Sequence, residues 1–129
     1  MSSQLTETIL VVDDDPTVLK LCANILTMGG YNIIESNGGD EALRVFQEAR
    51  SEVQLALVDV MMPGINGVEL CRRIESASPE TKVVLMSGYD PGDVARLTGQ
   101  ERTLPIIWKP FRAESLLRMI ENVLNAAPL

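Results

Sequence analysis

The chain contains no histidine among its 129 residues. Histidine is the commonest general base and the commonest transition-metal ligand in proteins, so neither role can rest on it here. A phosphohistidine cannot form within this chain either. We therefore expect the chemistry of any site in this chain to depend on carboxylates.

Cysteine is scarce as well, with Cys22 and Cys71 as the two examples. Two lone thiols form neither the disulfide framework of a small secreted domain nor the close spacing of a zinc site. Both fall in predicted helices, and Cys22 lies on an apolar stripe. We expect buried, reduced thiols that pack as small apolar side chains.

Basic residues are fewer than acidic ones, 11 against 18, which gives a formal net charge of −7. Because the lysines and arginines are spread singly along the chain, they do not predict a surface for nucleic acid or for an anionic membrane. The charge leaves open a metal cation and a protein partner.

Long apolar runs are absent too, since no run approaches the length of a membrane span and residues 1–8 lack the regions of a signal peptide. We interpret the protein as cytoplasmic. The length and the 46% hydrophobic content suit a single domain over residues 1–129, with a core over about residues 8–125. The mostly apolar residues after Asn125 are either a natural end or part of a linker.

Apolar runs and amphipathic stretches alternate along the chain. The apolar runs predict strands at Ile9–Val12, Asn32–Glu35, Leu55–Val58, Lys82–Met86 and Leu104–Trp108. The amphipathic stretches predict helices near Pro16–Met28, Asp40–Ala49, Gly67–Ser76 and Ala113–Asn125, and a short, mobile helix in the segment that contains Pro91, Gly92 and Gly99. This alternation predicts an α/β fold whose parallel sheet is covered on both faces, which explains the continuous apolar strands.

The first helix carries clear boundary signals. Asp15 can cap its first turn, Pro16 suits the first helical position, and Gly29–Gly30 should end it. The stripe that should face the core consists of Val18, Leu21, Cys22 and Ile25.

Four of the predicted strands end in side chains that carry chemistry. Asp13 and Asp14 follow the first strand, Asp59 the third, Ser87 the fourth and Lys109 the fifth. Ligands of open parallel sheets bind outside the carboxyl ends of the strands, so these side chains should converge. Crowded carboxylates repel one another, and a divalent cation such as Mg²⁺ relieves that repulsion. Taken alone, residues 13–15 also fit a helix cap with spare acids, so the prediction depends on the joint pattern.

The residues beside two of these strand ends have their own signals. Lys109 precedes Pro110, and such a bond can be cis, which turns the chain sharply and aims the lysine. Gly88 follows Ser87 and has no side chain, so the hydroxyl could hydrogen-bond a phosphoryl oxygen without obstruction. An ordinary turn with an exposed lysine is the alternative for Lys109 alone.

Four motifs at these strand ends resemble the receiver domain of two-component response regulators. They are Ile-Leu-Val-Val-Asp-Asp-Asp-Pro (9–16), Asp-Val-Met-Met-Pro-Gly-Ile-Asn-Gly (59–67), Val-Val-Leu-Met-Ser-Gly-Tyr (83–89) and Trp-Lys-Pro-Phe (108–111). The resemblance covers almost the whole chain. It implies a flavodoxin-like (βα)5 doubly wound fold with a five-stranded parallel sheet in the order 2-1-3-4-5.

The resemblance also implies a role for each residue of the site. Asp59 is then the phosphoryl acceptor, and Ser87 and Lys109 contact the phosphoryl group. The residues implied to bind Mg²⁺ or Mn²⁺ are Asp13, Asp14, Asp59 and, through its backbone carbonyl, Met61. Such a domain is no enzyme beyond its own phosphorylation and dephosphorylation.

The partners implied by the resemblance are proteins. A histidine kinase or a histidine phosphotransfer protein donates the phosphoryl group, and a downstream protein or a fused module receives the signal. Phosphorylation is expected to shift an equilibrium between two surface arrangements around the fourth helix, the last strand and the last helix. A homodimer through the same elements stays open.

Three residues depart from the pattern of the family. Ile106 stands where many receivers have an aromatic side chain that swings inward, so that switch cannot operate as such. Trp108 or Tyr89 could report or transmit the change instead, although for Trp108 we favour stacking in the core, since it follows an apolar strand. Met61 and Tyr89 are bulky at positions that border the route of the attacking water, which predicts slow self-dephosphorylation.

Other functions fit parts of the sequence. Asp13 and Asp15 also match the Asp-x-Asp-x-Thr motif of haloacid-dehalogenase-like phosphatases, with Asp13 as nucleophile and Asp15 as acid, although Asp59 then has no role. A receiver-like binding module without phosphorylation is a second alternative, against which the complete set of acids, hydroxyl and lysine argues. A flavodoxin-type cofactor binder would share the fold, but no phosphate-cradling loop follows the first strand.

Overall fold

The computed structural model describes residues 6–88, 91–98 and 104–126. The strands in these residues are β1 (Thr8–Val12), β2 (Asn32–Ser36), β3 (Leu55–Asp59), β4 (Lys82–Ser87) and β5 (Ile106–Trp108). The helices are α1 (Pro16–Met28), α2 (Gly39–Ala49), α3 (Gly67–Ala77), α4 (Pro91–Thr98) and α5 (Ala113–Leu124). Across these ranges, every helix is too short or too polar to cross a membrane.

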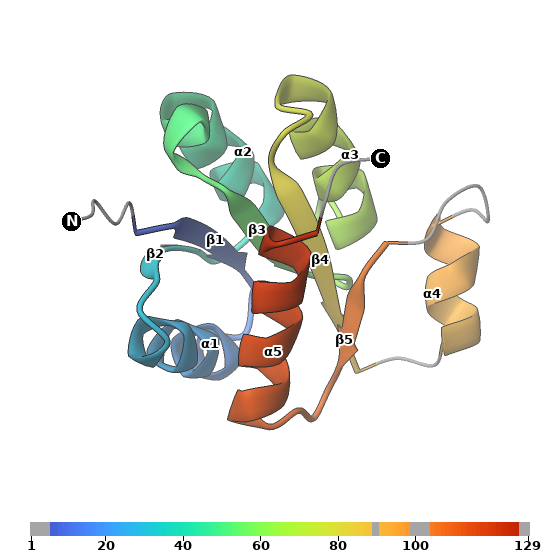
Figure 1. Cartoon of the computed structure of the whole chain (residues 1–129). Coiled ribbons are helices and arrows are strands. Elements are labelled where there is room, and N and C mark those ends of the chain that lie inside the picture. Colours follow the sequence, from blue (N-terminus) through green and yellow to red (C-terminus); the bar gives the residue numbers. More distant parts are fainter. Residues whose placement is uncertain (1–5, 89–90, 99–103, 127–129) are drawn as a thin grey trace.

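The strands form one parallel sheet in the order β2-β1-β3-β4-β5, which confirms the predicted topology. α1 and α5 cover one face of the sheet, α2 and α3 cover the other, and α4 lies on the β5 side of the molecule (Figure 1). Because all strands run in one direction, their carboxyl ends lie at the same edge of the sheet.

Each of the central strands β1, β3 and β4 contributes side chains to two separate hydrophobic cores, one on each face of the sheet. In β1, Leu10 and Val12 face the core under α2 and α3, whereas Ile9 and Val11 face the core under α1 and α5. β3 and β4 alternate in the same way. Successive side chains of a strand point to opposite faces, so burial of both faces requires an uninterrupted apolar run.

Helix α1 begins and ends where the sequence predicts. The Asp15 side chain accepts a hydrogen bond from the Thr17 N–H at 2.9 Å, and Pro16 opens the helix. One member of the predicted inward stripe is wrong, because Leu21 is 50% exposed. The helix instead buries the neighbouring stripe that consists of Leu19, Cys22, Ala23, Ile25 and Leu26.

Strand β5 differs from its prediction in length and in orientation. It begins at Ile106 rather than Leu104, because Pro105 has no N–H to donate to the ladder. Trp108 does not stack in the core as predicted but is 38% exposed. β5 is one of the two edge strands of the sheet, and along it Ile107 is buried whereas Trp108 lies at the surface. A 3₁₀ turn over Arg50–Glu52 was not predicted either.

The buried cysteines give a direct test of the packing. Both lie within the described residues, are fully buried and form no disulfide. Burial raises the pKa of the Cys22 thiol to about 11. We expect iodoacetamide to label neither cysteine in the native protein at about pH 8, and to label both in guanidinium chloride. Mass spectrometry of the alkylated protein checks this, and rapid labelling of Cys22 in the native state would contradict the packing of α1.

Candidate functional site

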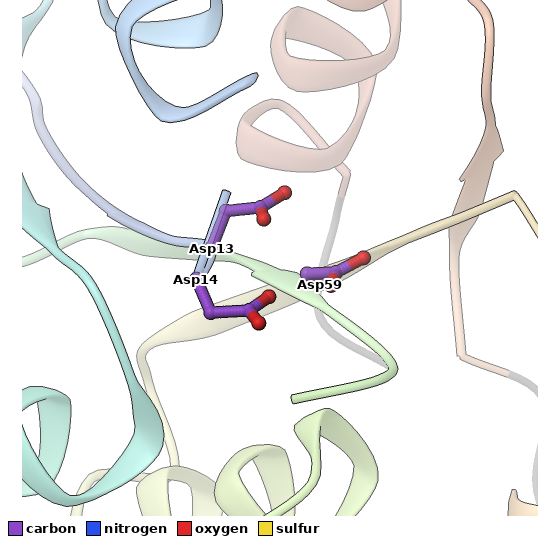
Figure 2. Close-up of side chains that lie close together, drawn as sticks. All are labelled: Asp13, Asp14 and Asp59. Carbon is purple, nitrogen blue, oxygen red and sulfur yellow. The ribbon is translucent and has the colours of Figure 1, made fainter. Parts of the chain in front are cut away.

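Three carboxylates meet at the carboxyl edge of the sheet. Asp13 and Asp14 follow β1, and Asp59 is the last residue of β3, the neighbour of β1. Figure 2 shows that all three side chains point to the same side, and one oxygen from each lies within 4.8 Å of the others. Asp13 and Asp59 are buried, whereas Asp14 is exposed. The structure thus brings together acids that lie 46 residues apart in the chain.

Local hydrogen bonds orient the first of these acids. The Asp13 Oδ1 atom accepts a hydrogen bond from the Asp15 N–H at 2.9 Å, where the chain turns from β1 into α1. Asp15 uses its own carboxylate to cap α1 and does not belong to the acidic cluster. Of the three consecutive aspartates, Asp13 and Asp14 therefore belong to the acidic cluster, and Asp15 caps α1.

Lys109 supplies the positive charge of the site. It follows β5, and its peptide bond to Pro110 is cis. The Nζ atom donates to Asp13 Oδ2 at 3.1 Å and to Asp59 Oδ1 at 3.0 Å. The lysine therefore bridges acids from two different strands.

The protonation equilibria reflect competition between burial and ion pairing. Burial raises the pKa of Asp59, the hydrogen bond from Lys109 opposes that effect, and the charge of Asp13 adds to it. Burial alone would lower the pKa of Lys109, but its hydrogen bonds to Asp59 and Asp13 outweigh burial, so that its pKa is raised. Lys109 is thus held in its charged form, and one ammonium group faces three carboxylates.

The donor set of the cluster fits a hard divalent cation. All three side chains offer carboxylate oxygens, which Mg²⁺ and Mn²⁺ prefer, and they lie close enough together to share one ion. The cluster contains neither sulfur nor nitrogen ligands, so it does not resemble a zinc site. Met61, two residues beyond Asp59, is 42% exposed and lies in the loop after β3.

The other predicted residues lie at neighbouring strand ends. Ser87 is the last residue of β4 and is fully buried, and its backbone carbonyl accepts a hydrogen bond from the Lys109 N–H at 2.7 Å. Gly88 lies beside the lysine, since a Cβ at this position would be 3.8 Å from the Lys109 Cβ. Ile106 is partly buried against the core under α2 and α3. Tyr89 lies outside the described residues.

Gly67 contacts the end of β3 in a way that the sequence pattern does not reveal. This first residue of α3 donates its N–H to the Val60 carbonyl at 2.8 Å. A Cβ at this position would overlap the carbonyl oxygen of Asp59, so the helix can start here only with glycine. The available signal is that the motif 59–67 ends in glycine, but the partner of that glycine is visible only in the fold.

The comparisons with known proteins agree with this architecture. The family profile of the response regulator receiver domain matches residues 9–121. The chain itself is 31% identical to a cyclic di-GMP phosphodiesterase of Thermotoga maritima and 30% identical to the sensor kinase CckA of Brucella abortus. Each of these matches extends over 118 residues, which is 92% of the chain. The chain spans 31% and 12% of the lengths of these two relatives.

Solved structures show the same likeness over nearly the whole chain. A response regulator receiver domain protein from Clostridium thermocellum is 28% identical and superposes with a TM-score of 0.83. The match covers 92% of this chain and 94% of that one.

Removing the charge of Lys109 should destabilise the protein. We expect Lys109→Met to lower the free energy of unfolding by about 2 kcal/mol at neutral pH, because Asp13 and Asp59 stay buried without their shared counter-charge. Mg²⁺ should raise the melting temperature of this variant more than that of the wild type, since the metal replaces the lost charge. Thermal melts with and without Mg²⁺ measure both effects.

A surface lysine provides the control for this variant. Lys20 pairs with Glu35 at 3.2 Å, but its side chain is 65% exposed, so Lys20→Met should change the melting temperature little. Equal melting temperatures for the two variants would show that Lys109 does not neutralise the acids.

Proposed function

The chain belongs to the response regulator receiver domain family, and from this premise we propose that it is a phosphorylation switch whose phosphoryl acceptor is Asp59. The observation that carries the proposal is the placement of Asp59. Its carboxylate lies at a strand end beside two further acids and accepts a hydrogen bond from Lys109 at 3.0 Å. A nucleophilic oxygen, a fixed cation and a cluster of metal-binding oxygens therefore occupy one small site.

The reaction needs positioning and charge neutralisation more than covalent assistance. A carboxylate oxygen of Asp59 attacks phosphorus, the new O–P bond forms an acyl phosphate, and the bond from phosphorus to the donor breaks. Lys109 neutralises charge on the acceptor side of this transfer, because it already hydrogen-bonds Asp59. Mg²⁺ or Mn²⁺, held by Asp13, Asp14, Asp59 and the carbonyl of Met61, supplies positive charge to the phosphoryl oxygens when bound.

Ser87 and Gly88 are proposed to border the phosphoryl group on the β4 side. The Ser87 hydroxyl contacts a phosphoryl oxygen, and Gly88 leaves the approach open. The new negative charge then shifts the equilibrium between two arrangements of the surface formed by α4, β5 and α5. Ile106 cannot act as an aromatic switch there, and the exposed Trp108 is a reporter of that surface rather than part of its core.

The phosphoryl donor is proposed to be a phosphohistidine on a histidine kinase or a histidine phosphotransfer protein. An apolar groove is lined by Lys109 together with Val18, Leu21, Pro110 and Phe111. This groove offers a protein donor a docking surface beside Asp59, the proposed phosphoryl acceptor. Leu21 is 50% exposed, which leaves its apolar side chain accessible to a protein that docks in this groove. The output partner is a downstream protein or a fused module.

The phosphatase alternative is disfavoured by the position of Asp15. In that reading Asp15 would be the general acid beside the nucleophile Asp13, yet its carboxylate caps α1 and is not part of the cluster. A receiver domain is typically non-catalytic apart from its own phosphorylation chemistry. A binding module without phosphorylation would not need the complete set of acids and the bridging lysine.

Formation of an acyl phosphate tests the proposal. We expect intact-mass spectrometry to show one phosphoryl adduct after incubation with acetyl phosphate and Mg²⁺. The adduct should disappear with Asp59→Asn, and it should be strongly reduced with Asp13→Asn or after chelation of the metal. These variants remove the nucleophile and a metal ligand without a change in side-chain size.

The outcomes separate the three functions. Absence of an adduct under every condition would favour the binding module. Transfer that survives Asp59→Asn but requires Asp13 would favour the phosphatase.

The phosphorylated form should be long-lived, because neither Met61 nor Tyr89 is suited to orient an attacking water. We expect Met61→Asn to shorten the lifetime of the adduct severalfold, since an amide can hydrogen-bond water beside Asp59. Loss of the adduct with time after removal of acetyl phosphate measures the lifetime. A lifetime of seconds in the wild type would show that these side chains do not retard hydrolysis.

A further inference from the structure

The turn between β2 and α2 contacts the backbone of Asp13. Ser36, the last residue of β2, pairs with Val12, the last residue of β1. Its carbonyl accepts a hydrogen bond from the Asp13 N–H at 3.2 Å. The β1–β2 ladder therefore extends one residue beyond the end of β1 and reaches the first acid of the cluster.

The Glu41 side chain stabilises this turn by two hydrogen bonds. Its Oε1 atom accepts a hydrogen bond from the Ser36 hydroxyl at 3.1 Å and another from the Asn37 N–H at 3.0 Å. The Asn37 N–H, followed by the Ser36 hydroxyl, lowers the pKa of Glu41, so the carboxylate is ionised at neutral pH. Ser36 is 1% exposed, and its hydroxyl also lies 3.0 Å from the Gly38 carbonyl. The turn is thus closed from within by a side chain of α2.

The same turn supports the loop that follows Asp59. Gly39 packs so tightly against this loop that a Cβ would lie 2.8 Å from the Ile65 carbonyl oxygen. Ile65 lies between β3 and α3, in the segment that also carries Met61. The β2–α2 connection therefore contacts Asp13 through the Ser36 carbonyl, and the first residue of α2, Gly39, contacts the loop that follows Asp59.

We propose that Glu41 is a positioning residue for the metal site. By holding the β2–α2 turn, it fixes the Ser36 carbonyl that anchors the backbone of Asp13, and thereby places the Asp13 carboxylate for a divalent cation. Glu41 itself does not belong to the acidic cluster, so its action is indirect. The inference deepens the proposed function, since the cation is the one required for phosphorylation of Asp59.

The physical reason is preorganisation. The Asp13 side chain is already oriented by the Asp15 N–H and by Lys109, and these contacts act only if its backbone stays in place. Groups that orient metal ligands typically change metal affinity about tenfold or more when they are removed. Loss of Glu41 should therefore weaken metal binding while leaving the nucleophile Asp59 intact.

The test compares Mg²⁺ binding to two substitutions of Glu41 by isothermal titration calorimetry, without a phosphoryl donor. We expect Glu41→Ala to weaken Mg²⁺ binding about tenfold. Glu41→Gln should bind within about twofold of the wild type, because an amide oxygen can accept the same two hydrogen bonds. Acyl phosphate formation in Glu41→Ala should be slow at low Mg²⁺ and recover at saturating Mg²⁺.

Glu69 provides a matched control for the loss of one negative charge. It also lies in the first turn of a helix, but it pairs with Arg73 at 3.1 Å and does not belong to the cluster of Asp13, Asp14 and Asp59. Glu69→Ala should bind Mg²⁺ as the wild type does. A similar loss of affinity in Glu69→Ala and Glu41→Ala would assign the effect to general electrostatics and overturn the proposal.

The remaining outcomes are equally decisive. Each of three results overturns the proposal. The first is unchanged Mg²⁺ affinity in Glu41→Ala, and the second is an equal loss of affinity in Glu41→Gln and Glu41→Ala. The third is the absence of measurable Mg²⁺ binding by the wild type. If Glu41→Ala does not fold, Ser36→Ala removes the hydroxyl bond alone; a severalfold loss of affinity supports the proposal, and wild-type affinity overturns it. Failure of the proposed function would appear instead as Mg²⁺ binding without any acyl phosphate on Asp59.

Discussion

The balance of charge at the carboxyl edge of the sheet governs this structure. Buried carboxylates on adjacent strands repel one another in a region of low dielectric constant, and the repulsion grows as water is excluded. Lys109 reduces it by donating to both Asp13 and Asp59. One lysine cannot neutralise three acids, so the fold leaves an excess of negative charge that a metal cation can bind. Because of this excess negative charge, the binding of a cation or the addition of an anionic group would change the electrostatic energy of the site.

Several unrelated parts of the chain hold this arrangement together. The parallel register places the ends of β1 and β3 side by side, and the Ser87 carbonyl anchors the backbone of Lys109. Gly67 allows α3 to start directly against the backbone of Asp59. None of these contacts is chemically special. Together they hold the Asp13 and Asp59 carboxylates within hydrogen-bond distance of the Lys109 ammonium group, and preorganised charge of this kind is what the proposed phosphoryl transfer would need most.

The two hydrophobic cores explain how such a site is tolerated. Burial of both sheet faces gives β1, β3 and β4 a rigid apolar frame, and the polar cluster is confined to the strand ends, where the loops begin. The exposed Trp108 and the partly buried Ile106 lie on the edge strand β5, which Lys109 directly follows.

The sequence by itself determined the elements of the fold and the residue types of the site. Continuous apolar runs, helix caps such as Asp15 and the acids at strand ends are local signals, because each depends on neighbours only a few positions away. The strand order also followed, through resemblance of the motifs. Only the tertiary structure decided which side of α1 Leu21 occupies, that Trp108 lies at the surface, that Gly67 packs against the Asp59 backbone, and that Glu41 hydrogen-bonds Ser36 and Asn37. Those outcomes depend on how closely segments that are far apart in the chain pack against one another. The assembled sheet and helices set these packing distances, so no local sequence pattern can predict them.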